Sequence, residues 1–186
     1  MQKEYTIDGI KVLFPHIAYP GQISYMENII KATRHGQNGL LQSPTGTGKT
    51  LCLLSSILAY LKHERDTWTT EKGELPPITK ILYTSRTHTQ LKQCVKELNA
   101  TCYLPNMVVL GSRDQMCVEP SLREKEFKGF ALNNECRKKR KLGTGSGGCR
   151  FYKKQSEGPP APCATPLPDI EEFISYGKRV GHCPFY

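Results

Sequence analysis

The feature that most constrains this chain is an eight-residue segment, Ser43–Thr50, that ends in the Gly-Lys-Thr of a Walker A phosphate loop. A short apolar run, 39–42, precedes the segment, and apolar residues at helical spacing follow it from about Lys49 to His63. Glycines allow backbone N–H groups to face a phosphate, and the start of a helix adds partial positive charge. The order strand, glycine-rich turn and helix therefore predicts a phosphate-binding loop, with a chance glycine-rich turn as the alternative.

Two residues of this loop carry the chemistry that the pattern predicts. Lys49 would reach the β and γ phosphates of ATP, and the Thr50 hydroxyl would ligate Mg²⁺. Ser43 stands where the pattern usually has glycine, which weakens the match without removing a phosphate contact. The expected nucleotide contacts in the loop are Ser43, Pro44, Thr45, Gly46, Thr47, Gly48, Lys49 and Thr50.

The elements around the loop alternate between strand and helix. Alternation of apolar residues around Asp8-Gly9 predicts a hairpin from Tyr5 to Phe14. Further helices are expected at Gln22–Thr33 and Thr87–Leu98, a polar loop at Asp66–Pro77, and buried strands at Gly39–Gln42, Lys80–Thr84 and Met107–Leu110. This order predicts an α/β fold, a RecA-like parallel sheet with crossover helices.

The character of the sequence changes after Gly111. Runs of β-branched residues stop, while cysteines, basic clusters, a glycine-rich insert at Gly143–Gly148 and a proline-rich stretch at Pro159–Pro168 appear. We therefore predict two parts, an ATP-binding part over residues 1–112 and a small, mainly helical cysteine domain over 113–186.

Cysteine spacing suggests a metal centre in the second part. Four of the eight cysteines, Cys117, Cys136, Cys149 and Cys183, fall in a segment with few large apolar residues, which needs a staple to fold. Four thiolates suit zinc or a [4Fe–4S] cluster, and their spacing does not separate the two metals. Cys163 lies between prolines and is left out of the set, although it could replace a neighbour.

The other cysteines have a simpler interpretation. Cys52, Cys94 and Cys102 lie on apolar faces, where a free thiol behaves as a small hydrophobic group. No apolar run approaches the roughly 20 residues of a membrane span, and the N-terminus lacks a signal-peptide pattern. We therefore expect an intracellular protein without a membrane partner.

Charge favours a polyanionic partner. Lysine and arginine number 26 against 17 acidic residues. The basic run 137–141 is followed by Arg150, Lys153 and Lys154, which are interleaved with two aromatic residues that can stack on unpaired bases, Phe151 and Tyr152. The run predicts a DNA contact through Lys138, Lys139 and Arg150. A solvated basic face or a nuclear localisation signal remains the alternative.

Taken together, several ordered motifs resemble the XPD-like (Rad3-type) superfamily 2 iron–sulfur DNA helicases. The motifs in the first part are Tyr19-Pro20-x-Gln22, the phosphate loop, Thr84-Ser85-Arg86-Thr87-His88 and Gly111-Ser112-Arg113. The cysteine contexts are Gln115-Met116-Cys117, Glu135-Cys136-Arg137-Lys138-Lys139, Gly148-Cys149-Arg150-Phe151-Tyr152 and His182-Cys183-Pro184-Phe185-Tyr186. The resemblance spans nearly the whole chain.

The resemblance implies a monomeric, nuclear, ATP-dependent motor that unwinds DNA from 5′ to 3′ in repair, recombination and telomere maintenance, acting on single-stranded and forked DNA. It implies [4Fe–4S] rather than zinc at the four cysteines. Gln22 would recognise adenine, a role that spacing alone supports only weakly. Arg86 and Thr87 would grip the single strand, and Arg113 would lie beside the cluster near the DNA.

The chain also departs from the family pattern. The Asp-Glu-Ala-His motif and the second motor lobe are absent, so we expect this piece to bind ATP poorly and to hydrolyse essentially none. Two other classes of function stay open. One is a P-loop regulator with a zinc-binding interaction module, and the other is a truncated isoform that binds DNA without turnover.

Overall fold

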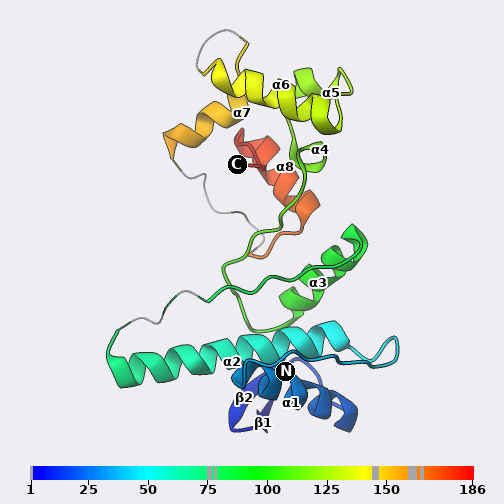
Figure 1. The fold of residues 1–186 in the computed structure, drawn as a ribbon, viewed down its shortest axis with the longest axis vertical. Helices are drawn as coiled ribbons and strands as arrows, with labels where there is room; N and C mark the ends of the chain where they lie inside the picture. The colour runs from blue at the N-terminus through cyan, green and yellow to red at the C-terminus, as the bar shows by residue number, and fades with distance from the viewer. Residues whose placement is uncertain (1, 75–76, 78, 144–146, 159–162, 164–165) are drawn as a thin grey trace. The chain divides into compact units, whose positions relative to one another are not determined.

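The computed structural model describes residues 2–74, 77, 79–143, 147–158, 163 and 166–186. The chain divides into two compact units, Met1–Asn106 and Met107–Tyr186 (Figure 1). This division falls a few residues before Ser112, and the assignment of ATP binding and a metal cluster to the two parts stays a prediction.

The first unit begins with the predicted hairpin. Strands β1 (Lys3–Ile7) and β2 (Ile10–Phe14) pair antiparallel, with Ile7 opposite Ile10. The two turn residues, Asp8 and Gly9, both have positive φ, 49° and 78°, as a tight two-residue hairpin turn requires. One face of β2 is fully buried, so the hairpin packs as predicted.

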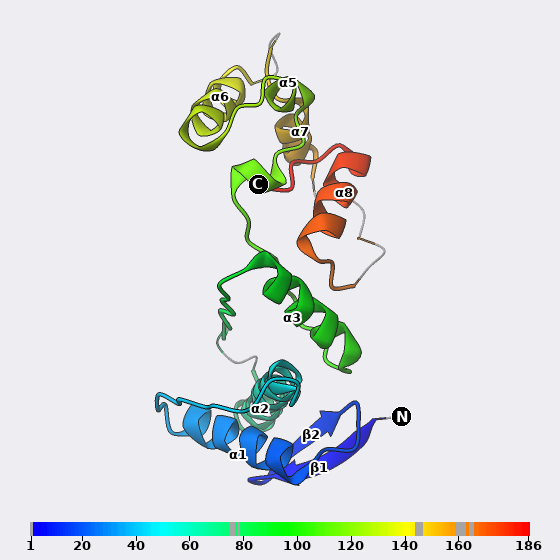
Figure 2. The ribbon, with the colours of Figure 1, turned by 90° about the vertical axis from the view of Figure 1, so that its right-hand side faces the viewer.

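Helix α1 (Pro20–Arg34) confirms the helix expected from Gln22 onward. It begins with proline in its first turn, and its buried residues Met26, Ile29 and Ile30 lie on one face. This face packs on helix α2, and the two helices lie side by side (Figures 1 and 2).

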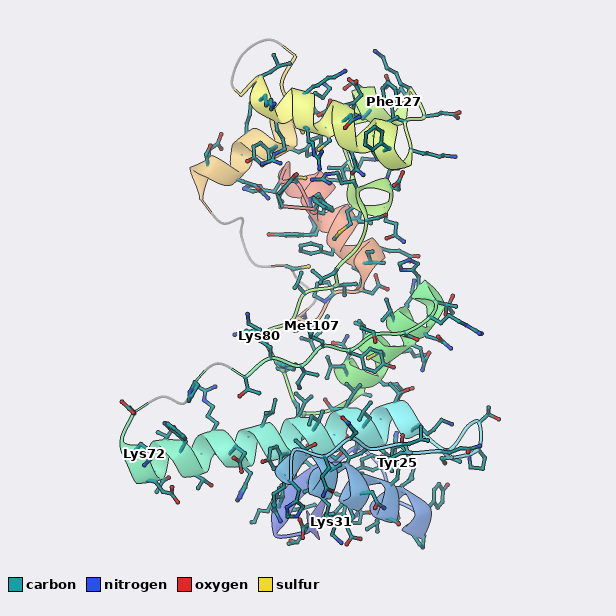
Figure 3. All side chains as sticks on the ribbon, in the orientation of Figure 1. Tyr25, Lys31, Lys72, Lys80, Met107 and Phe127 are labelled. Atoms are coloured by element: carbon teal, nitrogen blue, oxygen red, sulfur yellow. The ribbon has the colours of Figure 1, made fainter. Side chains whose placement is uncertain are left out.

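Helix α2 (Lys49–Lys72) is longer than predicted. Its first part is buried at Leu51, Cys52 and Leu58, but it continues through most of the expected polar loop until Gly73, whose φ of 70° ends it. The distal part is exposed, with Lys72 near its end (Figure 3). The loop prediction was wrong because polarity was given more weight than the good helix-forming residues of this segment.

Helix α3 (His88–Ala100) confirms the helix predicted between Thr87 and Leu98. Thr87 is its N-cap, and the Thr87 hydroxyl accepts a hydrogen bond from the Gln90 backbone N–H at 3.3 Å. Cys94 and Leu98 are buried on the face of α3 nearest α2, while Cys102, just beyond the helix, is exposed. The expectation that Cys102 is a core thiol was therefore wrong.

The predicted parallel sheet is not formed in the described part of the chain, where β1 and β2 make the only sheet. Residues 39–42, 80–84 and 107–110 are assigned no strand. Many of their apolar side chains are exposed, Leu40 by 100% and Leu82 by 85%, and the others, such as Leu41 and Val109, are only half-buried. An apolar segment becomes a strand only when a neighbour supplies the hydrogen-bond ladder, and no such neighbour pairs with these three.

The second unit is helical in its described residues, as predicted for the cysteine domain. Its elements are α4 (Arg113–Met116), α5 (Pro120–Arg123), α6 (Gly129–Lys141), α7 (Arg150–Lys153), η1 (Lys154–Glu157) and α8 (Ile170–Val180). Asp169 caps α8, where its carboxylate accepts two backbone hydrogen bonds. The core of this unit is small and contains Met116, Val118, Leu122, Leu132, Phe151, Leu167 and Tyr176.

Parts of three predicted segments lie outside the described residues: the end of the polar loop, the glycine-rich insert and the proline-rich stretch. No helix in the described ranges is both long enough and apolar enough to cross a bilayer.

Candidate nucleotide site and candidate metal centre

The phosphate loop lies directly before α2, and its backbone conformation depends on two glycines. Gly46 and Gly48 have φ of 79° and 73°, in the left-handed region that side chains with a Cβ avoid. Gly48 is also the N-cap of α2, so the next residue, Lys49, begins the helix. A helix start preceded by such a turn directs backbone N–H groups toward one point, as anion binding requires.

The side chains of the loop bond to one another. The Lys49 ammonium donates hydrogen bonds to the carbonyl oxygens of Ser43 at 2.9 Å and Pro44 at 2.7 Å. The hydroxyls of Ser43 and Thr47 are 2.6 Å apart. Phosphate oxygens could therefore replace the two carbonyls as acceptors without moving the helix, because the lysine already reaches over the loop.

Gln22, on the first turn of α1, joins the loop from a distance in sequence. Its Nε2 donates to the carbonyl oxygen of Thr47 at 3.0 Å, and its Oε1 accepts from the Tyr19 backbone N–H at 3.0 Å. A carboxamide has two donors and two acceptor sites. One donor and one acceptor site of Gln22 therefore remain. Adenine would need this donor for N7 and this acceptor for the N6 amine.

Tyr83 is a residue of this site that the sequence analysis missed. Burial, followed by the neighbouring Cys94, raises the pKa of Tyr83, while a hydrogen bond with the Thr50 side chain opposes that rise. Tyr83 is therefore a neighbour of Thr50, the residue proposed to ligate magnesium. Its position in the expected strand 80–84 gave no signal, since a tyrosine there reads as an ordinary strand residue.

Arg86 and Thr87 lie between Tyr83 and α3. Arg86 and Thr87 are both exposed. The Thr87 hydroxyl accepts the hydrogen bond that caps α3. That bond assigns the Thr87 hydroxyl a structural role in starting α3. Contact of either residue with a nucleic acid stays a prediction.

The structure brings the four predicted ligands to one cavity. Cys117 follows α4, Cys136 lies within α6, Cys149 caps α7 and Cys183 follows α8, and all four line the same cavity. All eight cysteines are free thiols. Within the described ranges, no group of three or more His, Cys, Asp or Glu side chains is arranged to hold a metal ion.

Three of the four thiols in this cavity are shifted toward their neutral form. Burial raises the pKa of Cys117 and of Cys183, and it raises the pKa of Cys149 to about 11. Neutral thiols pack as small apolar groups. A cation would reverse this preference, because metal binding replaces the thiol protons.

Two arginines also line the cavity, and both keep a buried donor without an acceptor. The Nε atoms of Arg113 and Arg140 are buried and make no hydrogen bond. In the described part of the chain, neither guanidinium has a carboxylate within ion-pair distance. The cavity thus combines four thiols that can become thiolates with two cations that lack an anion. This combination fits a metal centre with net negative charge. Iron–sulfur clusters and zinc bound by four thiolates both have that charge.

The predicted DNA-contacting residues of this unit differ in their surroundings. Lys138 is exposed and paired with Glu135 at 2.6 Å, and Arg150 is exposed with its guanidinium 4.9 Å from the Phe151 ring centroid. Lys139 is mostly buried, 3.6 Å from Glu119. Arg113 donates to Asn133 and lies over Phe185. Arg113 and Lys139 therefore have partners within the protein, and their contact with DNA stays a prediction.

Comparison with known families gives two matches. Residues 83–186 match the family model described as DEAD_2, and residues 19–126 match the one described as DEAD/DEAH box helicase. No solved structure matches the chain.

Similar proteins carry the name regulator of telomere elongation helicase 1. The protein from Mus musculus is 37% identical over 97% of this chain, and the one from Homo sapiens is 36% identical over 97%. A homolog from Arabidopsis thaliana is 38% identical over 98% of the chain. The chain spans only 17% to 19% of the length of these relatives.

Proposed function

Because this chain belongs to the XPD-like family of DEAD/DEAH box helicases, we propose that it is the ATP-binding part of a DNA helicase that unwinds DNA from 5′ to 3′. The protein would work in the nucleus as a monomeric motor on single-stranded and forked DNA. Its settings would be repair, recombination and telomere maintenance. The names of the relatives support a role at telomeres.

One observation carries this proposal. The loop Ser43–Thr50 turns through two left-handed glycines into α2, with Lys49 placed over the loop and Gln22 bonded to it. ATP bound there would have its phosphates against Lys49 and its Mg²⁺ against the Thr50 hydroxyl. Gln22 would bind adenine through its remaining donor and acceptor.

The experiment replaces Lys49 with alanine in the full-length protein. We expect DNA-stimulated ATP hydrolysis to fall roughly 100- to 1,000-fold, the usual loss when one group that stabilises a transition-state charge is removed. Lys72→Ala, at the exposed end of the same helix, is the matched control and should keep normal turnover. A Lys49→Ala protein that unwinds duplexes at the normal rate would refute the motor function.

For the second unit we propose that Cys117, Cys136, Cys149 and Cys183 hold a [4Fe–4S] cluster. Bound there, the cluster would crosslink four segments around a small apolar core and so stabilise the domain. The shared cavity and the two arginines without counter-anions support this proposal. Zinc is the alternative that fits the same donors.

Anaerobic purification distinguishes the two metals. A brown protein that absorbs broadly near about 400 nm and contains iron supports the cluster. A colourless protein with stoichiometric zinc supports the interaction module instead. Cys136→Ser should lose the metal, whereas Cys102→Ser, which changes an exposed thiol of the first unit, should keep it.

We also propose that each unit contacts single-stranded DNA through exposed cations of its own. Arg86 in the first unit and Lys138 and Arg150 in the second are exposed and can neutralise phosphates. Of the two aromatic residues that follow Arg150, Phe151 is buried in the core and Tyr152 is half-buried, so only the Tyr152 ring is available for stacking on a base. Affinity for single strands should therefore fall steeply as salt increases.

A further inference from the structure

The four segments that carry the candidate ligands also supply a second set of side chains. Each cysteine has an arginine or a tyrosine three or four residues away along the chain, and these four side chains meet. They form what we call the arginine–tyrosine cluster, made of Arg113, Arg140, Tyr152 and Tyr186. All four belong to one unit and line the cysteine cavity.

The Tyr186 hydroxyl is the centre of this cluster. It accepts hydrogen bonds from the Arg113 guanidinium and from Arg140, whose Nη1 is 2.6 Å away. Arg140 also donates to the Tyr152 hydroxyl at 3.2 Å. The Arg140 guanidinium lies over both rings, 4.2 Å from the Tyr186 centroid and 4.6 Å from that of Tyr152, and the two rings contact edge to face at 5.1 Å.

This geometry places two positive charges on one neutral acceptor. Like charges that share an acceptor repel one another, and the repulsion is strongest where water is excluded. The buried Nε atoms of Arg113 and Arg140 have no acceptor, and no carboxylate compensates either cation among the described residues. Ring faces offset only part of this cost. The arrangement therefore lacks an anion.

The cysteine thiols that line the cavity supply the missing anion when they lose their protons. Arg113 and Arg140 line the same cavity as the four cysteines Cys117, Cys136, Cys149 and Cys183. Once the thiols ionise on metal binding, their negative charge faces the two guanidinium groups. The nearest acidic side chain on that wall, Glu119, already pairs with Lys139.

We propose that the arginine–tyrosine cluster holds the four cysteine segments together and supplies the positive charge that stabilises the loaded four-thiolate centre, with Arg140 as its main positioning residue. The inference rests on the metal centre proposed above. Arg140 lies on α6, the helix that carries Cys136. It donates hydrogen bonds to Tyr152, which follows Cys149, and to Tyr186, which follows Cys183. It thus ties three of the four ligand segments to one cation.

The proposal separates two contributions of Arg140, its charge and its forked hydrogen bonding. Arg140→Gln removes both. Arg140→Lys keeps the charge but loses the planar fork that bonds two tyrosines. Tyr186→Phe keeps the ring and removes the hydroxyl that both arginines share. Lys141→Gln is the matched control, since it removes one charge from the exposed next position of α6.

The experiment uses the full-length protein, purified anaerobically with its metal bound. Two quantities are measured for each variant, the rate of metal release to a chelator and, where iron is bound, the midpoint potential of the centre. We expect Arg140→Gln and Tyr186→Phe to release metal roughly 10- to 100-fold faster, the usual effect of removing a group that orients metal ligands. Lys141→Gln should match the wild type.

The potential tests the role of charge, which a purely structural residue would not affect. Loss of a cation beside the centre disfavours an added electron, so Arg140→Gln should lower the potential. Arg140→Lys should restore the potential while still releasing metal faster than the wild type.

Three results would overturn the inference. A loaded wild type whose release rate and potential are unchanged in Arg140→Gln would refute the cluster's role while leaving the metal centre intact. Equal shifts in Arg140→Gln and Lys141→Gln would reduce the effect to general surface charge. A wild-type protein purified with neither iron nor zinc would refute the proposed centre itself and this inference with it.

Discussion

The side-chain Nε2 of Gln22 donates a hydrogen bond to the backbone carbonyl oxygen of Thr47, 3.0 Å away. This bond joins the start of α1 to the phosphate loop across 25 residues of sequence. A Cβ at position 48 would lie 3.0 Å from the same Nε2, which adds to the constraint that the left-handed φ of 73° already places on this glycine. If Gln22 binds adenine as proposed, recognition of the base and the shape of the loop are coupled through one amide.

Replacing Gln22 with alanine tests that coupling. In the full-length helicase we expect kcat/KM for ATP to fall and the preference for ATP over GTP to shrink roughly 10- to 100-fold, since a two-bond contact with adenine provides about 1–3 kcal/mol of discrimination. Hydrolysis assays with both nucleotides measure the ratio. Gln37→Ala, an exposed glutamine beyond the end of α1, should leave it unchanged. An unaltered ratio in Gln22→Ala would restrict this residue to supporting the loop.

The pair formed by Lys139 and Glu119 should contribute to the stability of the second unit. Their side chains are 19% and 10% exposed, and the Glu119 Oε2 has no hydrogen-bond partner. Lys139→Met leaves the carboxylate buried without its cation, so we expect a loss of about 1–3 kcal/mol, less than for a fully buried pair because the lysine retains some solvent contact. Hydrogen exchange of the α6 amides measures this local free energy.

Two further variants establish that the loss comes from the unpaired charge. Glu119→Gln combined with Lys139→Met should recover most of the stability, because neither charge is then left alone. Lys138→Met breaks an exposed pair with Glu135 on the same helix and should cost under about 0.5 kcal/mol. If the double variant were as unstable as Lys139→Met, lost packing rather than the unpaired carboxylate would be the cause.

The thiol of Cys52 should make the first unit less stable at high pH. Cys52 is 1% exposed, and burial raises its pKa from 9.0 to about 11. Above about pH 9 the unfolded chain loses this proton while the folded chain keeps it, so stability is complete below pH 9 and falls as pH rises toward 11. Between pH 8 and 10.5 the expected loss from this thiol is about 2 kcal/mol.

Urea denaturation followed by Trp68 fluorescence measures the effect, because Trp68 is the only tryptophan and lies on the same helix. Other groups titrate in this range, so the useful quantity is the difference between the wild type and Cys52→Ala. The variant should be less stable at pH 8 but should lose less stability on going to pH 10.5. If the wild type and Cys52→Ala lost the same stability between pH 8 and 10.5, Cys52 would not contribute to the pH dependence.

Sequence reasoning succeeded where the signal was local. The hairpin depends on Asp8-Gly9 and α1 on its apolar spacing, and the helix expected from Thr87 to Leu98 is confirmed as α3. It failed where the structure of a segment depends on other segments that pack beside it. The expected strand 39–42 has two apolar residues at its centre, but Leu40 remains fully exposed without a neighbouring strand.

The same contrast holds at the candidate sites. The glycine-rich loop and the four cysteines could be found from the sequence, because glycines and cysteines rarely fall into such patterns by chance. Arg140 and Tyr186 could not, since an arginine in a basic run and a tyrosine after Cys-Pro-Phe look like surface and core residues. Only the fold shows that they bond to each other beside the cysteine cavity. Side-chain partners distant in sequence carry no periodic pattern.

The basic run of α6 should bind DNA through only some of its members. Lys138 and Lys141 are exposed, whereas Lys139 pairs with Glu119 and Arg140 bonds to two tyrosines. Replacing Lys138 and Lys141 together with glutamate in the full-length helicase should weaken single-strand binding and reduce the salt dependence. Each lost phosphate contact lowers the slope of log K against log salt by about 0.7.

A double variant in the first unit provides the charge-matched control. Lys62→Glu with Lys72→Glu changes the net charge by the same amount on the distal part of α2, where both lysines are exposed. Fluorescence anisotropy with a labelled oligonucleotide at several salt concentrations compares the two proteins. A specific contact at α6 requires that the slope fall only in the Lys138/Lys141 variant. Equal falls in both would mean that the strand senses net charge alone, because a non-specific field does not depend on which face carries it.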